Sequence, residues 1–108
     1  MVMSQAREIQ EMVRKISERF APDKIILFGS HARGEGKEDS DVDLLVLFSE
    51  LDSPRRRANE LYVALAGSSL SKDIVVSTTE RFERYRNVVN TVYWPAAREG
   101  KVLYERPA

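Results

Sequence analysis

Apolar residues recur at helical spacing near the start of the chain. Between Ser4 and Phe20 they occupy positions 9, 12, 13, 16 and 20, which lie on one face of a helix. Pro22 then ends the periodic segment, because the residue before a proline is disfavoured in helical conformation. The pattern predicts an amphipathic helix over residues 4–20 that packs on a core through this face.

Three short apolar runs, rich in β-branched residues, predict strands. They cover residues 24–28, 42–48 and 72–77. The second run is continuously apolar from Leu44 to Phe48, whereas a strand exposed on one face would alternate. We therefore expect the second strand at a central position of a sheet, covered on both faces.

The remaining segments carry helix signals. Further helices are expected over residues 53–67, 79–86 and 92–99. Ser53 and Thr79 are suitable N-caps, Pro54 suits a first helical position, and Gly67 and Gly100 suit helix ends. The chain of 108 residues contains no repeat and no linker, so residues 1–108 are expected to form a single domain.

Composition excludes several classes of function. The chain has 17 basic and 17 acidic residues, so no strong overall field favours nucleic acid as a stable partner. It has no cysteine, which excludes disulfides, thiolate zinc sites and a cysteine nucleophile. No apolar run approaches the roughly 20 residues of a membrane span, and the N-terminus lacks the apolar segment of a signal peptide. A cytoplasmic protein without a membrane partner is expected.

A turn follows directly on the first predicted strand, at Gly29 to Gly34. Glycine lets a ligand approach the backbone closely, Ser30 offers a hydroxyl and an amide, and Arg33 adds a fixed positive charge. These groups can hold the phosphates of a nucleotide.

Two carboxylates stand at the entrance of the second predicted strand. Asp41 and Asp43 are two residues apart, so in an extended chain they point to the same side. Such a pair repels itself unless a cation lies between, and its hard oxygens suit Mg²⁺, which takes further ligands from substrate phosphates. Asp73, at the start of the third predicted strand, is the expected third acid, able to complete a two-metal site and to accept a proton.

These residues resemble the signature of the minimal nucleotidyltransferases, small members of the DNA polymerase β-like nucleotidyltransferase superfamily. The matching positions are Gly29-Ser30, Ala32-Arg33-Gly34, Ser40-Asp41 and Asp43-Leu44. The resemblance implies an α+β fold, with a small mixed β-sheet flanked by helices. It also implies ATP held by the Gly-Ser turn, two Mg²⁺ ions on the three aspartates, and transfer of AMP with release of pyrophosphate.

The resemblance further implies a protein partner. Members of this family are commonly encoded beside a helical HEPN toxin and act as its antitoxin, and some resembling proteins adenylylate a tyrosine of that toxin. The larger relatives carry an acceptor-binding domain that is missing here, which disfavours a small-molecule acceptor. The expected function is therefore Mg²⁺-dependent AMP transfer to a hydroxyl, a tyrosine of a HEPN partner.

Other interpretations of the same residues stay open. A non-catalytic antitoxin could neutralise a HEPN ribonuclease by covering its active site. Taken alone, Asp41 and Asp43 are more typical of acids that cap a turn, and only the joint match with the Gly29–Arg33 turn favours a nucleotide site. Asp73 could instead be a solvated acid at a strand end. His31 is expected to be solvated. A calcium loop is disfavoured because Leu44 replaces a required glycine.

Two further groups have no assigned role. Arg55, Arg56 and Arg57 lie in the first turn of a predicted helix, where cations oppose the helix dipole. They are expected on a solvated face, or in contact with an acidic partner or with phosphates. Trp94, next to Pro95, fits either the core or an interface.

Overall fold

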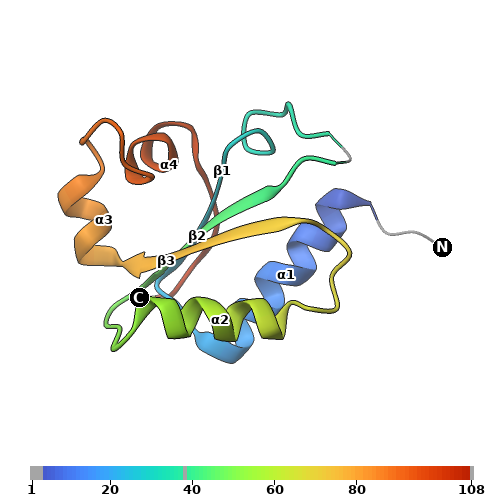
Figure 1. Cartoon of the computed structure of the whole chain (residues 1–108), viewed down its shortest axis with the longest axis horizontal. Helices are drawn as coiled ribbons and strands as arrows, with labels where there is room; N and C mark the ends of the chain where they lie inside the picture. The colour runs from blue at the N-terminus through green and yellow to red at the C-terminus, as the bar shows by residue number, and fades with distance from the viewer. Residues whose placement is uncertain (1–3, 38, 108) are drawn as a thin grey trace.

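The computed structural model describes residues 4–37 and 39–107, which form four helices and a four-stranded sheet (Figure 1). In chain order the elements are α1 (Gln5–Phe20), β1 (Lys24–Phe28), β2 (Val42–Phe48), α2 (Pro54–Ala64), β3 (Lys72–Thr78), α3 (Thr79–Tyr85), α4 (Tyr93–Glu99) and β4 (Lys101–Glu105). The strand order is β3-β2-β1-β4. β1 is antiparallel to β2 and β4, and β2 is parallel to β3, so the sheet is mixed, as the family resemblance implied.

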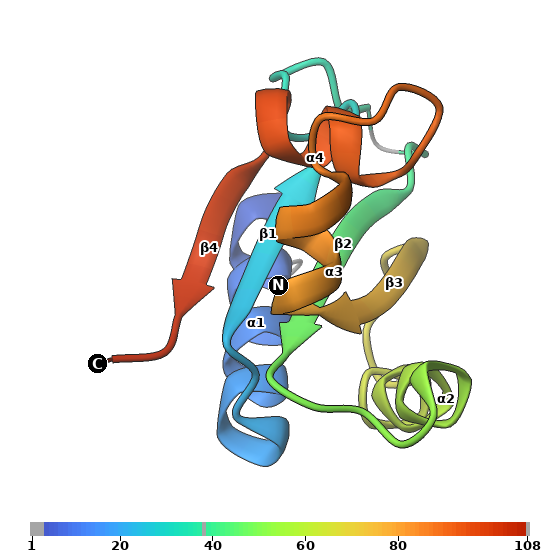
Figure 2. The same cartoon turned by 90° about the vertical axis from the view of Figure 1, so that its left-hand side faces the viewer.

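The sheet separates two apolar clusters. One lies between the sheet and helices α1 and α2, and its members include Met12, Ile16 and Leu61. The smaller one lies under α3 and α4 and includes Phe82 and Tyr93. Figure 2 shows α3 and α4 in front of the sheet and α1 behind it. Alternate residues of the strands serve the two clusters, which is the period-two consequence of an extended chain.

The central position predicted for the second strand is confirmed. β2 is hydrogen-bonded on both sides, and residues 44–48 are all buried. Helices cover both of its faces, so an apolar side chain is needed at each successive position. The parallel pairing of β2 and β3 requires a crossover, which α2 provides.

The element boundaries differ from the prediction in a few places. β4 was not predicted, because this edge strand is short and its residues are mostly exposed. α2 ends at Ala64, and residues 65–67 form a turn. The cap of α3 is Thr78 instead of Thr79: its hydroxyl accepts a hydrogen bond from the Arg81 N–H at 3.1 Å.

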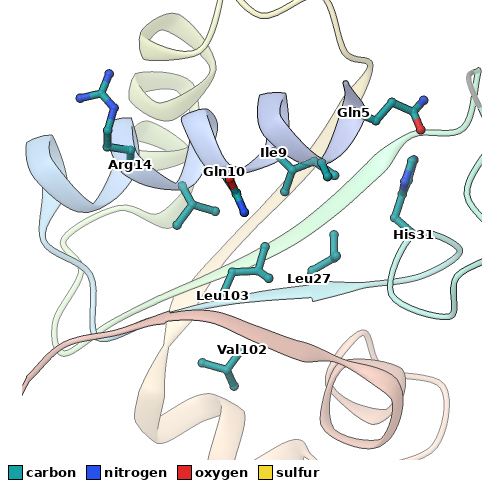
Figure 3. Close-up of a pocket in the computed structure, with 10 residues that line it drawn as sticks. Gln5, Ile9, Gln10, Arg14, Leu27, His31, Val102 and Leu103 are labelled. Atoms are coloured by element: carbon teal, nitrogen blue, oxygen red, sulfur yellow. The ribbon is translucent and has the colours of Figure 1, made fainter. Parts of the chain in front are cut away.

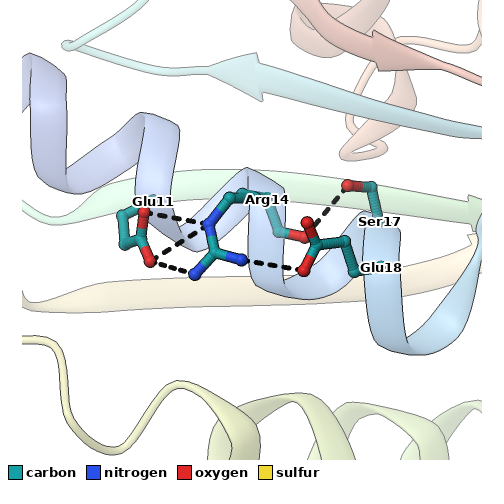
Figure 4. A network of polar contacts seen from close by, with 4 residues as sticks. All are labelled: Glu11, Arg14, Ser17 and Glu18. Carbon is teal, nitrogen blue, oxygen red and sulfur yellow. Dashed lines mark hydrogen bonds and ion pairs between the residues drawn. The ribbon is translucent and has the colours of Figure 1, made fainter.

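The exposed face of α1 carries an ion-pair network (Figure 4). Arg14 donates to Glu11, three residues earlier, and to Glu18, four residues later, the latter at 2.8 Å. Pairs at these spacings contribute about 0.3–0.5 kcal/mol each when exposed. The network supports the helix without contacting the predicted site.

In the described part of the chain, no helix has the length and apolarity needed to cross a membrane.

Candidate functional site

The predicted phosphate-binding turn is a tight, hydrogen-bonded turn at the end of β1. The N–H groups of Ala32 and Arg33 donate to the Gly29 carbonyl at 3.1 and 3.2 Å, and the Glu35 N–H donates to the Ser30 carbonyl at 2.9 Å. The first residue of the turn has φ of +77°, a left-handed conformation that favours glycine. The turn is therefore fixed by backbone geometry.

Gly29 also brings the turn into contact with the second strand. A Cβ atom placed on this residue would overlap the carboxylate of Asp43. Glycine is thus required twice, by its φ angle and by the close approach of an acid. Two of the residues selected from the sequence are in direct contact, although 14 positions separate them.

The parallel pairing of β2 and β3 brings two of the predicted acids side by side. Asp43 is the register partner of Asp73, so both side chains project from the same face of the sheet. This is the face that α3 and α4 cover further along the strands. Asp41 lies one residue before β2 and is exposed.

The nearby acids affect the pKa of Asp43. Its pKa is raised, first by desolvation and then by the negative charges of Asp73 and Asp41. The positive charges of His31 and Arg33 act in the opposite direction. Asp43 is therefore the centre of an acidic group that favours either a proton or a cation.

His31 is held in place, and the expectation that it is solvated was wrong. The side chain is half-buried, its Nε2 atom donates to the Ser40 carbonyl at 3.2 Å, and the ring lies against Gly36. The hydrogen bond ties the turn to the residue that precedes Asp41. His31 thus helps to set the distance between the turn and the acids.

Arg33 is bound to two carboxylates. Its Nε atom contacts Glu35 at 2.9 Å and one terminal nitrogen contacts Glu99, in α4, at 3.0 Å. These hydrogen bonds raise the pKa of the guanidinium. A guanidinium carries five N–H groups, so donors remain for a phosphate while both contacts persist. The contact with Glu99 was not predicted, because Glu99 lies 66 positions along the chain from Arg33.

The residues fit a bound Mg²⁺ ion only in part. Among the described residues, no group of three or more histidine, cysteine, aspartate or glutamate side chains is gathered closely enough to hold a metal ion. Asp43 is nevertheless flanked by two like charges that a cation would compensate. Mg²⁺ retains several waters and takes ligands from substrate phosphates, so it does not need an all-protein cage. The donor set therefore suits a metal that arrives with a nucleotide.

A separate groove of about 690 Å³ lies between α1 and the β1–β4 edge of the sheet (Figure 3). Ile9, Leu27 and Leu103 are among its apolar lining residues, and His31 lies near one end. None of the six residues predicted for the site lines it. This groove is therefore distinct from the acidic group.

The groups left without a role are now placed. Arg57 packs its guanidinium over the ring of Phe48, 4.8 Å from the centroid, and so contributes to packing. Arg55 and Arg56 are exposed at the start of α2. The half-buried ring of Trp94 is covered by the guanidinium of Arg98, 3.3 Å from its centroid.

One residue near the acids was not among the residues predicted for the site. The hydroxyl of Tyr62, in α2, lies 3.4 Å from the Asp73 carboxylate and 2.8 Å from the backbone nitrogen of Ile74. In the sequence, the only sign of this contact was a phenol among the aliphatic residues of the helix, and it did not indicate where the hydroxyl points.

Comparisons with known proteins identify the family of the chain. The chain matches the nucleotidyltransferase domain family over residues 9–95. It is 35% identical over 100 residues to the protein adenylyltransferase MntA of Thermococcus cleftensis, and this match covers 87% of the chain and 99% of that protein.

Solved structures share the fold. A protein assigned as a nucleotidyltransferase from Sulfolobus solfataricus superposes with a TM-score of 0.65 at 19% identity, covering 93% of this chain and 79% of that one. A mutant form of the toxin-antitoxin MntA-HpeT gives a TM-score of 0.52 at 20% identity, covering 88% of this chain and 71% of that one. The family match over residues 9–95 and the similarity to MntA show that the chain belongs to the nucleotidyltransferase domain family.

Proposed function

We propose that the protein transfers AMP from ATP to a hydroxyl group of a partner toxin and acts as its antitoxin. The observation that carries this proposal is the convergence of Gly29, Asp43 and Asp73 on one side of the sheet. A phosphate-sized turn and paired carboxylates in contact are the two parts that nucleotidyl transfer needs.

In the proposed reaction the turn positions the triphosphate. The Ser30 hydroxyl and amide and the free donors of Arg33 bind phosphate oxygens, and Gly29 lets them come close to the backbone. Asp41, Asp43 and Asp73 would hold Mg²⁺, which when bound neutralises charge on the phosphates.

Asp73 is proposed to accept the proton of the attacking hydroxyl. It is exposed, so an acceptor on another protein can reach it. The acceptor oxygen forms a bond to the α-phosphorus, the bond to the bridging oxygen breaks, and pyrophosphate leaves. The proton moves to the Asp73 carboxylate, so atoms and charge balance.

The proposed acceptor is a tyrosine of a HEPN toxin. Support comes from the named activity of the Thermococcus cleftensis relative, a protein adenylyltransferase, and from the fold shared with a toxin-antitoxin. The proposed setting is the cytoplasm, where ATP and Mg²⁺ are supplied.

The proposal is tested by incubating the protein with the product of the adjacent reading frame, Mg²⁺ and ATP labelled at the α-phosphate. Label on a tyrosine of the partner, identified by mass spectrometry, is the expected result. ATP labelled at the γ-phosphate is the matched control, because that label should leave as pyrophosphate. An unlabelled partner in a mixture of two folded proteins contradicts the proposal.

A non-catalytic antitoxin is the second candidate, favoured by one observation: the described acids form no preassembled metal cage. The Asp43→Asn variant separates the two. If it binds the toxin and still neutralises it in cells, complex formation is sufficient. If it binds the toxin but no longer protects, neutralisation depends on catalysis.

A further inference from the structure

Tyr62 connects the two faces of the sheet at its open β3 edge. Its ring packs against the cluster formed with α1 and α2. Its hydroxyl reaches Asp73, whose register partner Asp43 belongs to the opposite face. β3 is the outer strand of the sheet, so no strand blocks this route around the edge.

The hydroxyl of Tyr62 has a defined orientation. Its oxygen accepts the hydrogen bond of the Ile74 N–H at 2.8 Å, a backbone group next in sequence to Asp73. The phenolic proton is then free to point elsewhere, and the Asp73 carboxylate oxygen Oδ1 lies 3.4 Å away. This second contact is longer than an ordinary hydrogen bond between two oxygens.

Asp73 needs such a partner. It is exposed, and an exposed carboxylate at a strand end samples several rotamers. A donor that is itself hydrogen-bonded to the next residue of the same strand restricts the carboxylate: Oδ1 lies toward Tyr62, which leaves Oδ2 for a ligand. Loss of a hydrogen bond that orients a metal-binding side chain typically lowers metal affinity or activity by 10–100-fold.

We propose that Tyr62 is a positioning residue, which orients the Asp73 carboxylate for metal binding and proton acceptance. The inference rests on the proposed function, because it assigns Tyr62 through the role of Asp73. Tyr62 itself does not contact the reacting atoms.

The test compares Tyr62→Phe with Tyr104→Phe. Both tyrosines are half-buried against the same cluster, but within the described residues the Tyr104 hydroxyl forms no hydrogen bond. Binding of Mn²⁺ to the full chain is measured by electron paramagnetic resonance, with the non-hydrolysable analogue AMP-PNP present. Tyr62→Phe is expected to weaken Mn²⁺ binding about tenfold, and Tyr104→Phe to leave it unchanged. Equal Mn²⁺ affinity in Tyr62→Phe and wild type overturns the inference.

A double-mutant cycle separates orientation from general loosening of the fold. If Tyr62 acts through Asp73, adding Tyr62→Phe to Asp73→Asn weakens Mn²⁺ binding no further. A second loss of about tenfold in the double variant overturns the inference. In AMP transfer, Tyr62→Phe should lower kcat with KM for ATP within about twofold, because the phosphates are bound elsewhere.

A further measurement needs no variant and so does not depend on folding. The ring ζ-carbon resonance of Tyr62 in ¹³C-labelled wild-type protein is expected to move as Mg²⁺ and AMP-PNP are added, and a stationary resonance at saturation overturns the inference. If wild type transfers AMP and binds Mn²⁺ while Tyr62→Phe does so equally well, only the inference fails. If wild type does neither, the proposed function fails with it.

Discussion

Asp23 and Asp43 occupy opposite ends of the sheet and contrast in every respect. Asp23 precedes β1 and accepts hydrogen bonds from Ser49 at 2.7 and 2.9 Å and from Thr79 at 2.6 Å, with Arg106 3.6 Å away. Asp43, near the start of β2, accepts no side-chain hydrogen bond from the described residues and is flanked by two other acids.

The pKa values of the two groups move in opposite directions. Burial alone raises the pKa of Asp23, but the hydrogen bonds from Thr79 and Ser49 and the charges of Arg106 and Lys24 outweigh it, so the net pKa is lowered. Desolvation and then the charges of Asp73 and Asp41 raise that of Asp43. At one end of the sheet the aspartate stabilises the fold, and at the other end the carboxylates form an unfavourable arrangement of like charges.

The largest expected effect is on activity at the acidic end. Asp43→Asn should lower AMP transfer by about 10³-fold or more, a loss of roughly 4 kcal/mol of transition-state stabilisation. In EDTA the same variant should melt at the wild-type temperature or higher, because the amide removes a charge that faces Asp73 and Asp41. Transfer assays and thermal melts at neutral pH check both parts.

The sign of this stability effect follows from the raised pKa. Any stability contributed by Asp43 is present below its unfolded pKa, about 3.9, and is lost as the pH rises through the folded value. At neutral pH Asp43 is therefore a net cost to the metal-free fold. A clear drop in melting temperature for Asp43→Asn in EDTA would show that this end of the sheet is stabilised by its charge after all.

The next effect concerns the turn that supports the acids. Gly29 and Gly34 have nearly equal φ angles, +77° and +76°, but only Gly29 has a neighbour where a Cβ would stand. Gly34→Ala should cost about 1 kcal/mol of unfolding free energy from backbone strain. Gly29→Ala should cost about 3 kcal/mol, because overlap with the Asp43 carboxylate adds to the same strain.

Urea unfolding of the two glycine variants measures this difference, and titration with Mn²⁺ shows whether the acids move. Gly29→Ala should also weaken Mn²⁺ binding, whereas Gly34→Ala should not. Equal losses of stability would mean that the Asp43 side chain can move away from the turn at little cost.

A smaller effect is expected at the other end of the sheet, where Asp23 accepts its hydrogen bonds. Asp23→Asn should lower the unfolding free energy by about 2 kcal/mol at pH 7, since it weakens several charge-assisted hydrogen bonds. Its lowered pKa means that this stability is present above the unfolded pKa, about 3.9, and is lost as the pH falls through the folded value.

The gap between wild type and Asp23→Asn should therefore narrow in urea melts between neutral and strongly acid pH. AMP transfer by the folded variant should stay within about twofold of wild type. A gap that stays constant with pH would assign the contribution of Asp23 to packing instead of charge.

The same contrast explains what the sequence could predict. Local sequence patterns predicted the first three strands and the turn after the first one. These patterns place Gly29, Asp41, Asp43 and Asp73 at strand ends, so the residues of the acidic group could be named from the sequence. The register that pairs Asp43 with Asp73 depends on the crossover through α2, and only the fold fixes it.

Features that depend on distant contacts were missed. β4 is an exposed edge strand whose pairing with β1 is tertiary, and its residues carry little of the burial pattern that predicts a strand. The ring of Tyr62 packs against the apolar cluster, as a core residue would. The contact of its hydroxyl with Asp73 depends on the tertiary structure, so it could not be predicted from the sequence. Asp23 gave no signal, since its partners lie 26, 56 and 83 positions away.

The smallest expected effect concerns the exposed ion pair between Arg33 and Glu99, at the acidic end of the sheet. Glu99→Gln removes one of the two carboxylates that hold Arg33, and because the pair is exposed, the unfolding free energy should change by less than about 0.5 kcal/mol. The guanidinium is then freer to bind phosphate, so KM for ATP should fall about twofold with kcat unchanged. Glu80→Gln, which removes an exposed ion pair with Arg84 in α3, is the matched control and should leave KM unaltered. A higher KM in Glu99→Gln would mean instead that Glu99 orients Arg33 for the nucleotide. The acidic end of the sheet would then contain one carboxylate, that of Glu99, whose charge is compensated by an arginine.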